Sequence, residues 1–255
     1  MSEGLRLERQ GAVATVWIDR QPKMNTITVA MRDEFPPIFR DLDADDAARV
    51  IVIRGAGDKA FSAGGDVGEF LGLPPADLER WGDTLSAPEG CRKPVIAAID
   101  GYTMGAGLEL ALACDFRVAT QRSEFAFPEI RLGMIPGSGG TQRAARLIGL
   151  TRAKLFMMTG RRIPAEQAEA WGLITQAVPN DALDDTVATL ARELADQPPL
   201  ALRTLKAVLN RGADAPLETA LELERKAYAW LRSTHDYAEG VTAFLEKRPP
   251  KYTGR

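Results

Sequence analysis

Hydrophobic residues in the first half of the chain recur with the two-residue period of β-strands. The alternation in VATVWID (13–19) predicts a half-buried strand. Three further runs, rich in β-branched residues and closed by glycine or polar residues, predict buried strands at 49–55 (RVIVIRG), 94–101 (PVIAAIDG) and 116–120 (FRVAT). Because helical patterns separate some of these runs, the chain is predicted to have an α/β architecture.

Helical periodicity appears after the first of these strands and dominates after about residue 139. The earlier helix begins after Thr28, a suitable N-cap, and Pro36 and Pro37 inside it predict a kink or a break. Only the strand-like run LITQAVP (173–179) interrupts the later helical patterns. Their wide apolar faces are typical of helices that pack on a partner subunit as well as on their own domain.

The composition is that of a soluble globular protein and excludes several classes of partner. The chain has 255 residues, 45% of them hydrophobic, which suffices for a large core. Its net charge of −3 argues against nucleic acid, since phosphate binding normally needs a basic excess. No run approaches the ~18 apolar residues of a membrane span, and the first residues, MSEGLRLERQ, contain no apolar signal segment. With two cysteines, Cys91 and Cys114, that form no CxxC pair, we expect a cytoplasmic protein.

Two glycine-containing turns, each following a strand, offer backbone donors for an anionic oxygen. KAFSAGGDVGEF (59–70) contains the permissive pair Gly64-Gly65, although a plain surface loop would read the same way. YTMGAGLELALACD (102–115) leads from a strand into an apolar helix, whose first N–H groups, at Ala106 and Gly107, have no partner within the helix. Neither stretch matches a dinucleotide fingerprint, and PGSGGTQR (136–143) is not a P-loop.

Two carboxyl groups accompany these donors. Glu109 lies in the first turn of the apolar helix, where it could simply complement the helix dipole. Glu129 follows a proline among Phe125, Phe127 and Ile130, where an apolar surround would raise its pKa; alternatively it is a solvated carboxylate at a strand end. Together the donors and carboxyls indicate oxyanion stabilisation with paired acid–base groups.

Other catalytic arrangements find little support. The chain has one histidine, His235, which reads as a surface or capping residue, and no GxSxG, HExxH or CxxC motif.

Five segments, in this order and spacing, resemble the enoyl-CoA hydratase/isomerase (crotonase) superfamily. They are FSAGGDVGEF (61–70), KPVIAAIDGYTMGAGLELALACDFRVAT (93–120), FAFPEIRLGMIPGSGGTQR (125–143), MMTGRRIPAEQAEAWGLI (157–174) and GVTAFLEKRPPKYTGR (240–255). The resemblance implies a spiral of ββα units in residues 1–195, a C-terminal helical trimerisation region in residues 196–255, and a homotrimer or a dimer of trimers.

The resemblance also implies a role for individual positions. Gly65 and Ala106 match the oxyanion-hole pair; Ala106 stands where the family more often has glycine, which keeps the N–H but makes that wall bulkier. Glu109 and Glu129 match the two catalytic glutamates of the true hydratases. The positions that match coenzyme A-binding residues are Ala63, Asp66 and Val67 in the first turn and, commonly on a neighbouring subunit, Phe244 and Lys247.

The implied reaction is the reversible addition of water to a trans-2-enoyl-CoA, giving the 3-hydroxyacyl-CoA. The resemblance requires neither a metal nor a redox cofactor, since coenzyme A is part of the substrate. Three alternatives stay open: a 3,2-enoyl-CoA isomerase that uses Glu129 alone, a hydratase for a branched, cyclic or carnitine-like acyl group, and a non-catalytic CoA- or RNA-binding member. The segment 71–92 is expected to wall the acyl pocket, with Phe70 and Trp81 narrowing it.

Overall fold

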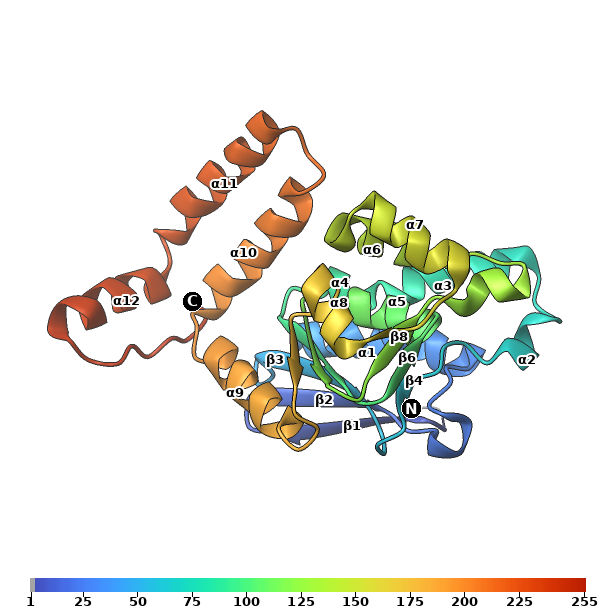
Figure 1. The fold of residues 1–255 in the computed structure, drawn as a ribbon. Helices are drawn as coiled ribbons and strands as arrows, with labels where there is room; N and C mark the ends of the chain where they lie inside the picture. Colours follow the sequence, from blue (N-terminus) through green and yellow to red (C-terminus); the bar gives the residue numbers. More distant parts are fainter. Residues whose placement is uncertain (1–2) are drawn as a thin grey trace.

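Two β-sheets form the body of the molecule in the computed structural model, which describes residues 3–255 (Figure 1). The larger sheet has the strand order β1 (Leu5–Gln10), β2 (Val13–Ile18), β3 (Val50–Gly55), β5 (Val95–Ile99), β7 (Phe116–Thr120), β10 (Gln176–Val178). Only the β1–β2 pair of this sheet is antiparallel. The smaller sheet has the order β4 (Ala60–Ser62), β6 (Tyr102–Met104), β8 (Glu124–Ala126), β9 (Ile163–Pro164).

The chain visits the two sheets alternately. Strands β3, β5 and β7 of the large sheet are followed directly by β4, β6 and β8 of the small sheet, and each pair leads into helical structure. The helical segments are α2 (Val67–Phe70), α3 (Pro75–Leu85) and α4 (Ala87–Gly90) after β4, α5 (Ala106–Leu112) after β6, and the 3-10 helix η2 (Pro128–Leu132) after β8. The repeated strand–strand–helix unit places the turns after β4, β6 and β8 next to one another.

The period-2 pattern of the large sheet separates two hydrophobic cores. Ile51, Ile53, Val95, Ala97 and Ile99 face the main core, while Val50, Val52, Ile96 and Ala98 face a second, smaller one. Helix α9 (Leu183–Ala195) covers that second face with Leu183, Val187 and Ala191. Because both faces are covered, these central strands read as continuous apolar runs.

Helix α1 (Val29–Ala44) continues through its two prolines. Thr28 caps it, since its Oγ1 accepts a hydrogen bond from the Met31 backbone N–H at 3.2 Å. The helix is not broken at Pro36 and Pro37. Its buried side chains, among them Phe35 and Phe39, pack into the main core, which offsets the cost of the interior prolines.

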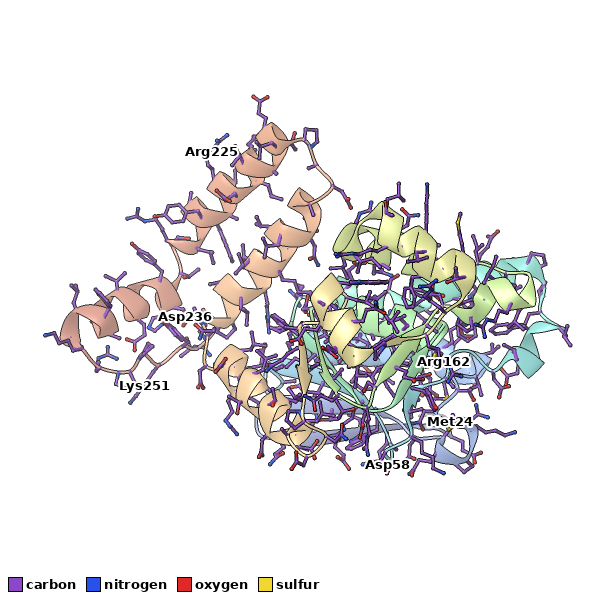
Figure 2. All side chains as sticks on the ribbon, in the orientation of Figure 1. Met24, Asp58, Arg162, Arg225, Asp236 and Lys251 are labelled. Atoms are coloured by element: carbon purple, nitrogen blue, oxygen red, sulfur yellow. The ribbon has the colours of Figure 1, made fainter. Side chains whose placement is uncertain are left out.

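The remaining helical segments precede α1, follow η2 or leave the body. The short 3-10 helix η1 (Gln21–Lys23) precedes α1, while α6 (Gly140–Ile148), α7 (Leu150–Thr159) and α8 (Ala165–Trp171) follow η2. The last three, α10 (Pro199–Gly212), α11 (Leu217–Leu231) and α12 (His235–Glu246), extend to one side as an arm (Figure 1). Arg225, Asp236 and Lys251 lie on this arm, across the molecule from Met24 and Asp58 (Figure 2).

The arm exposes much of its apolar surface. Helix α11 contributes no buried residue, and large hydrophobic side chains such as Leu217, Tyr228, Trp230 and Phe244 are exposed. His235 begins α12 with an exposed side chain, in agreement with the expected surface position. None of the helices in residues 3–255 has the length and hydropathy needed to cross a membrane.

Candidate active site

A cavity of about 180 Å³ lies where the turns after β4, β6 and β8 meet. Of the nine residues to which the family resemblance gives a role, six line it, namely Ala63, Gly65, Val67, Ala106, Glu109 and Glu129. They come from three successive strand–strand–helix units and are brought together only by the fold.

The backbone N–H groups of Gly65 and Ala106 are free to bind a ligand oxygen. The hydrogen bonds of residues 3–255 give neither N–H an acceptor. The first turn is held from its other side, because Ile27 N donates to Gly64 O and Asp66 N donates to Ile27 O, each at 2.8 Å. A Cβ built on Gly64 would lie 3.6 Å from the Ala106 nitrogen, so the two turns lie side by side. Ala106 is the first residue of α5, at the positive end of its dipole.

The glycines that flank Ala106 allow this close approach. Gly105 has φ of 49°, and a Cβ there would lie 2.9 Å from Glu129 Oε1. A Cβ on Gly107 would lie 2.6 Å from the carbonyl oxygen of Ser62 in β4. Without these side chains, α5 packs directly on the strand that precedes Gly65, and Glu129 can approach the turn.

Glu109 is almost fully buried, at 2% exposed, and is held by backbone donors. Its Oε1 accepts hydrogen bonds from Ser138 N at 2.6 Å and Gly140 N at 2.9 Å, at the start of α6. Burial raises the pKa of this carboxyl, while the two N–H groups and the positive charge of Arg143 oppose the rise. The carboxyl is therefore oriented by its surroundings and is not merely a first-turn complement to the dipole of α5.

Glu129 lies in η2 and has fewer hydrogen-bond partners than Glu109. Its Oε2 is buried and has no hydrogen-bond partner within residues 3–255. Burial raises its pKa to about 7, with a further contribution from the negative charge of Glu109. A carboxyl with this pKa can donate or accept a proton near neutrality, which the alternative of a solvated strand-end carboxylate does not provide.

The rest of the cavity wall is apolar. Leu78, Leu132, Met134 and Ile135 line it, together with Phe70 and Trp81 as the sequence suggested. The two aromatic rings meet edge to face with centroids 5.3 Å apart, and both lie against Gly65. Trp81 is 4% exposed, and its indole Nε1–H has no acceptor in the described part of the chain.

Three of the residues singled out in the sequence lie outside this cavity. Asp66 follows Gly65, but its carboxylate pairs with Arg20 Nη1 at 3.2 Å. Phe244, 82% exposed, and Lys247, which caps the C-terminus of α12, lie on the arm, away from the cavity (Figure 1). Within one chain, the structure therefore does not bring Phe244 and Lys247 to Glu109 and Glu129.

Sequence reasoning missed the groups that hold Glu109. Ser138 and Gly140 supply the donors from a segment 29 and 31 residues further along the chain. The signal was the glycine-rich PGSGG (136–140) directly before a helix, which exposes N–H groups in the same way as GAG (105–107). Residues 3–255 contain no cluster of three or more histidine, cysteine or acidic side chains placed to hold a metal ion.

Comparisons with known proteins agree with this geometry. The model of the enoyl-CoA hydratase/isomerase family matches residues 8–255. A short-chain-enoyl-CoA hydratase of Clostridium acetobutylicum is 34% identical over 95% of this chain and 94% of its own. A carnitinyl-CoA dehydratase of Shigella flexneri is 39% identical over the full length of both chains.

The fold agrees as well. The crystal structure of an enoyl-CoA hydratase from Bacillus anthracis superposes with a TM-score of 0.95 at 36% identity, over 99% of this chain and all of that one. The expected α/β fold, a crotonase-like spiral of ββα units, is confirmed.

Proposed function

Since this chain belongs to the enoyl-CoA hydratase/isomerase (crotonase) family, we propose that its cavity is the active site of an enoyl-CoA hydratase, a carbon–oxygen lyase. The reaction is the reversible addition of water to a trans-2-enoyl-CoA to give the 3-hydroxyacyl-CoA. The observation that carries the proposal is that two free backbone N–H groups, of Gly65 and Ala106, and two carboxyls, of Glu109 and Glu129, line one small cavity.

The proposed mechanism gives each group one task. The thioester carbonyl accepts hydrogen bonds from Gly65 N and Ala106 N, which stabilise the enolate-like oxygen as water adds to the β-carbon. Glu109, ionised, takes a proton from that water as its oxygen bonds to the β-carbon. Glu129, protonated, gives its proton to the α-carbon. The two carboxyls have then exchanged their protonation states, and the reverse dehydration starts from the product of the forward reaction.

Glutamine substitutions test the two carboxyls. Glu109→Gln and Glu129→Gln keep the side-chain shape but remove proton transfer, and we expect each to lower kcat for crotonyl-CoA hydration by about 100- to 10,000-fold. The control is Glu124→Gln, because Glu124 pairs with Arg162 at the surface and does not line the cavity. If both cavity variants hydrate crotonyl-CoA at near-normal rates, the proposed roles are wrong.

An isomerase would need only one of these carboxyls. Moving a double bond from position 3 to position 2 is a proton transfer that Glu129 could carry out alone. The ordered Glu109 favours hydration, because two backbone N–H groups hold it at the same cavity. Measuring 3-enoyl-CoA to 2-enoyl-CoA conversion beside hydration separates the two, since an isomerase would keep its activity in Glu109→Gln.

One observation favours a functionalised acyl group as a second candidate substrate. The indole N–H of Trp81 is unpaired although its ring lines the acyl cavity. If the ring presents this N–H to a bound acyl chain, an acceptor oxygen on that chain would pair with it. Trp81→Phe removes the donor and keeps an apolar ring. It should weaken hydration of hydroxyl-bearing or carboxylate-bearing enoyl-CoAs and spare crotonyl-CoA, whereas equal effects on both would contradict this candidate.

Coenzyme A is taken as part of the substrate, with Ala63, Asp66 and Val67 beside it. A homotrimer or dimer of trimers, built on the exposed apolar faces of α10–α12, would offer Phe244 and Lys247 to a neighbouring cavity.

The net charge of −3 supports a protein that does not bind RNA, and filter binding across a salt titration would test this. We expect it to act in the cytoplasm.

A further inference from the structure

The segment that donates to Glu109 is held in turn by the guanidinium of Arg143, in the first turns of α6. Arg143 Nη1 donates to Ser138 O at 3.0 Å, on the same residue whose N–H binds Glu109. The guanidinium also lies against Gly139, where φ is 97° and a Cβ would collide with Nη1. Arg143 therefore holds the turn at 138–140, which also donates to Glu109.

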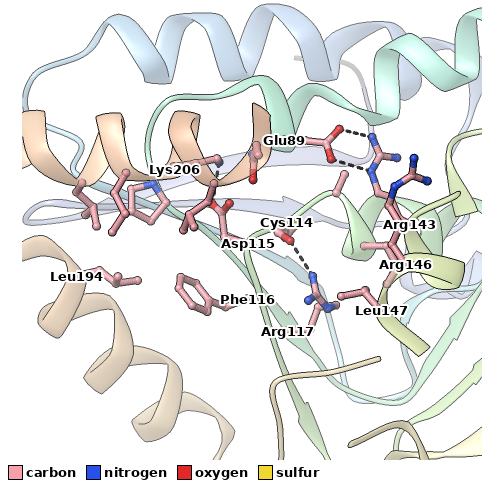
Figure 3. A pocket seen from close by; sticks show the side chains of 17 residues that line it. Glu89, Cys114, Asp115, Phe116, Arg117, Arg143, Arg146, Leu147, Leu194 and Lys206 are labelled. Atoms are coloured by element: carbon pink, nitrogen blue, oxygen red, sulfur yellow. Dashed lines mark hydrogen bonds and ion pairs between the residues drawn. The ribbon is translucent and has the colours of Figure 1, made fainter. Parts of the chain in front are cut away.

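Arg143 is itself fixed by two groups from another part of the chain. Its Nη2 and Nε donate to the two carboxylate oxygens of Glu89, at 2.6 and 3.2 Å, as Figure 3 shows. Its Nη2 also donates to Ser86 Oγ at 2.9 Å. The bidentate geometry determines the plane of the guanidinium, which a single contact would not. Ser86 directly follows α3, the helix that carries Trp81 in the acyl wall.

Arg143 acts from outside the proposed active site. It lines a second cavity, of about 400 Å³, that lies between the end of α5 and helix α10 (Figure 3). It does not line the cavity that holds Glu109 and Glu129. Its side chain is 15% exposed; its bonds to Ser138 and Ser86 are partly buried, whereas those to Glu89 are exposed. Any effect of Arg143 on the geometry of the site must therefore pass through the turn at 138–140.

We propose that Arg143 is a positioning residue for Glu109. By fixing the carbonyl of Ser138, it sets where the N–H groups of Ser138 and Gly140 point, and these hold the Glu109 carboxylate in one orientation toward the cavity. Hydrogen bonds to Glu89 and Ser86 hold the guanidinium in one orientation. The inference rests on the proposed hydration reaction, in which Glu109 must orient a water.

The charge of Arg143 adds a second effect. It favours the ionised form of Glu109 and so opposes the rise of that pKa caused by burial. Glu129 is the other titratable group that interacts with Glu109. The backbone donors at Ser138 and Gly140 oppose the rise of the Glu109 pKa, as Arg143 does. Loss of the guanidinium should therefore raise the pKa of Glu109 and move the acid limb of the pH–rate profile to higher pH.

The test compares Arg143→Gln and Arg143→Lys with Arg146→Gln in crotonyl-CoA hydration. Arg146 is a matched control, because it lies one turn further along α6, lines the same second cavity and bonds Gln142 O and the exposed Asp214. For Arg143→Gln we expect kcat to fall about 10- to 100-fold, with KM changed little and the acid limb moved to higher pH. Arg143→Lys keeps the positive charge, so the acid limb of its pH–rate profile should lie close to that of the wild type. Its kcat should be restored only in part, since an ammonium cannot form the planar, bidentate hydrogen bonds of a guanidinium.

Several outcomes would overturn the inference. It is wrong if folded Arg143→Gln keeps a normal kcat, if Arg146→Gln loses as much, or if kcat falls while the acid limb stays in place. If Arg143→Gln does not fold, Arg143→Lys and Glu89→Gln replace it in the test. We expect both variants to lose kcat, by less than Arg143→Gln would, and an unchanged kcat in both would contradict the inference.

A structural readout separates this inference from the proposed function. If the wild type hydrates no enoyl-CoA, the proposed function fails, and crystal structures of the wild type and of Arg143→Lys still test the positioning role. The hydrogen bond from Ser138 N to Glu109 Oε1 should be displaced in the variant. Its persistence there, in the geometry of the wild type, would overturn the inference.

Discussion

Lys206 of α10 forms a partly buried ion pair with Asp115, which stands three residues after the end of α5; Nζ and Oδ2 are 2.7 Å apart. Lys206 Nζ also donates to the carbonyl oxygens of Pro88 and Lys93, each at 3.0 Å. Asp115 Oδ2 accepts a further hydrogen bond from Val95 N at 2.8 Å. Burial raises the pKa of Asp115, and the charge of Lys206 opposes that rise. Helix α10 is thus joined to the body by a cation whose three donors are all used.

Removing Lys206 should destabilise the protein strongly. Lys206→Met leaves the Asp115 carboxylate partly buried and without its partner, and we expect the free energy of unfolding to fall by about 3–5 kcal/mol. Urea denaturation at a fixed protein concentration measures it. The control is Lys226→Met, which breaks an exposed pair with Glu222 and should cost under about 0.5 kcal/mol. Adding Asp115→Asn to Lys206→Met should recover part of the loss, and a loss under about 1 kcal/mol for Lys206→Met alone would contradict this interpretation of the ion pair.

The raised pKa of Glu129 predicts a bell-shaped pH dependence of kcat/KM. The active form has one proton on the two carboxyls, so activity falls at low pH, where both are protonated, and at high pH, where both are ionised. Because the pKa of Glu129 is about 7, the basic limb should lie near pH 7. Activity in the hydration direction should therefore decrease as pH rises through this value.

The reverse reaction offers an internal check. Hydration and dehydration use forms of the free enzyme that carry the same number of protons, and their kcat/KM ratio is the equilibrium constant, which does not depend on pH. Both directions should therefore show the same limbs. A hydration profile that stays flat from pH 6 to pH 9 would show that Glu129 does not supply the proton.

Gly105→Ala should impair catalysis as well as stability. An alanine at φ of 49° is strained by roughly 1–3 kcal/mol, and its Cβ would also crowd Glu129 Oε1. We expect a lowered melting temperature and a kcat reduced about tenfold or more. Gly149→Ala is the control, because Gly149 has φ of 78° and open space around it, so it should lose stability without losing kcat. Equal kcat losses in the two variants would show that strain, not crowding, is responsible.

Lys247 provides a test of the arm's proposed role. If Lys247 reaches the nucleotide end of coenzyme A on a neighbouring subunit, Lys247→Gln should raise KM for crotonyl-CoA about tenfold and leave kcat unchanged. Crotonyl-pantetheine lacks the nucleotide and should show no difference between wild type and variant. Sedimentation at the assay concentration reports whether the chain is a trimer or a dimer of trimers. A monomer that retains full activity would contradict this role.

Local patterns were sufficient for four of the longer strands, although they missed the six-residue β1. The runs at 13–18, 50–55, 95–99 and 116–120 are strands as expected, because β-branched residues with period 2, or continuous apolar runs covered on both faces, leave little alternative. The N-cap at Thr28 could also be predicted from the sequence, since the hydroxyl of Thr28 and the N–H of Met31 that donates to it are only three residues apart. The short strands β4, β6 and β8, of three residues each, were missed because so short a run has no period of its own.

The amino-acid sequence by itself determined which residue types stand after which strands, and so that Gly65, Ala106, Glu109 and Glu129 were the candidates. Only the tertiary structure decided that they line one cavity, that Ser138 and Gly140 hold Glu109, and that Arg143 holds Ser138. The physical reason is the range of the interactions. Caps, periodicity and turns depend on neighbours a few residues apart, whereas a burial-shifted pKa and a hydrogen bond across 29 residues exist only once the strand–strand–helix units have packed.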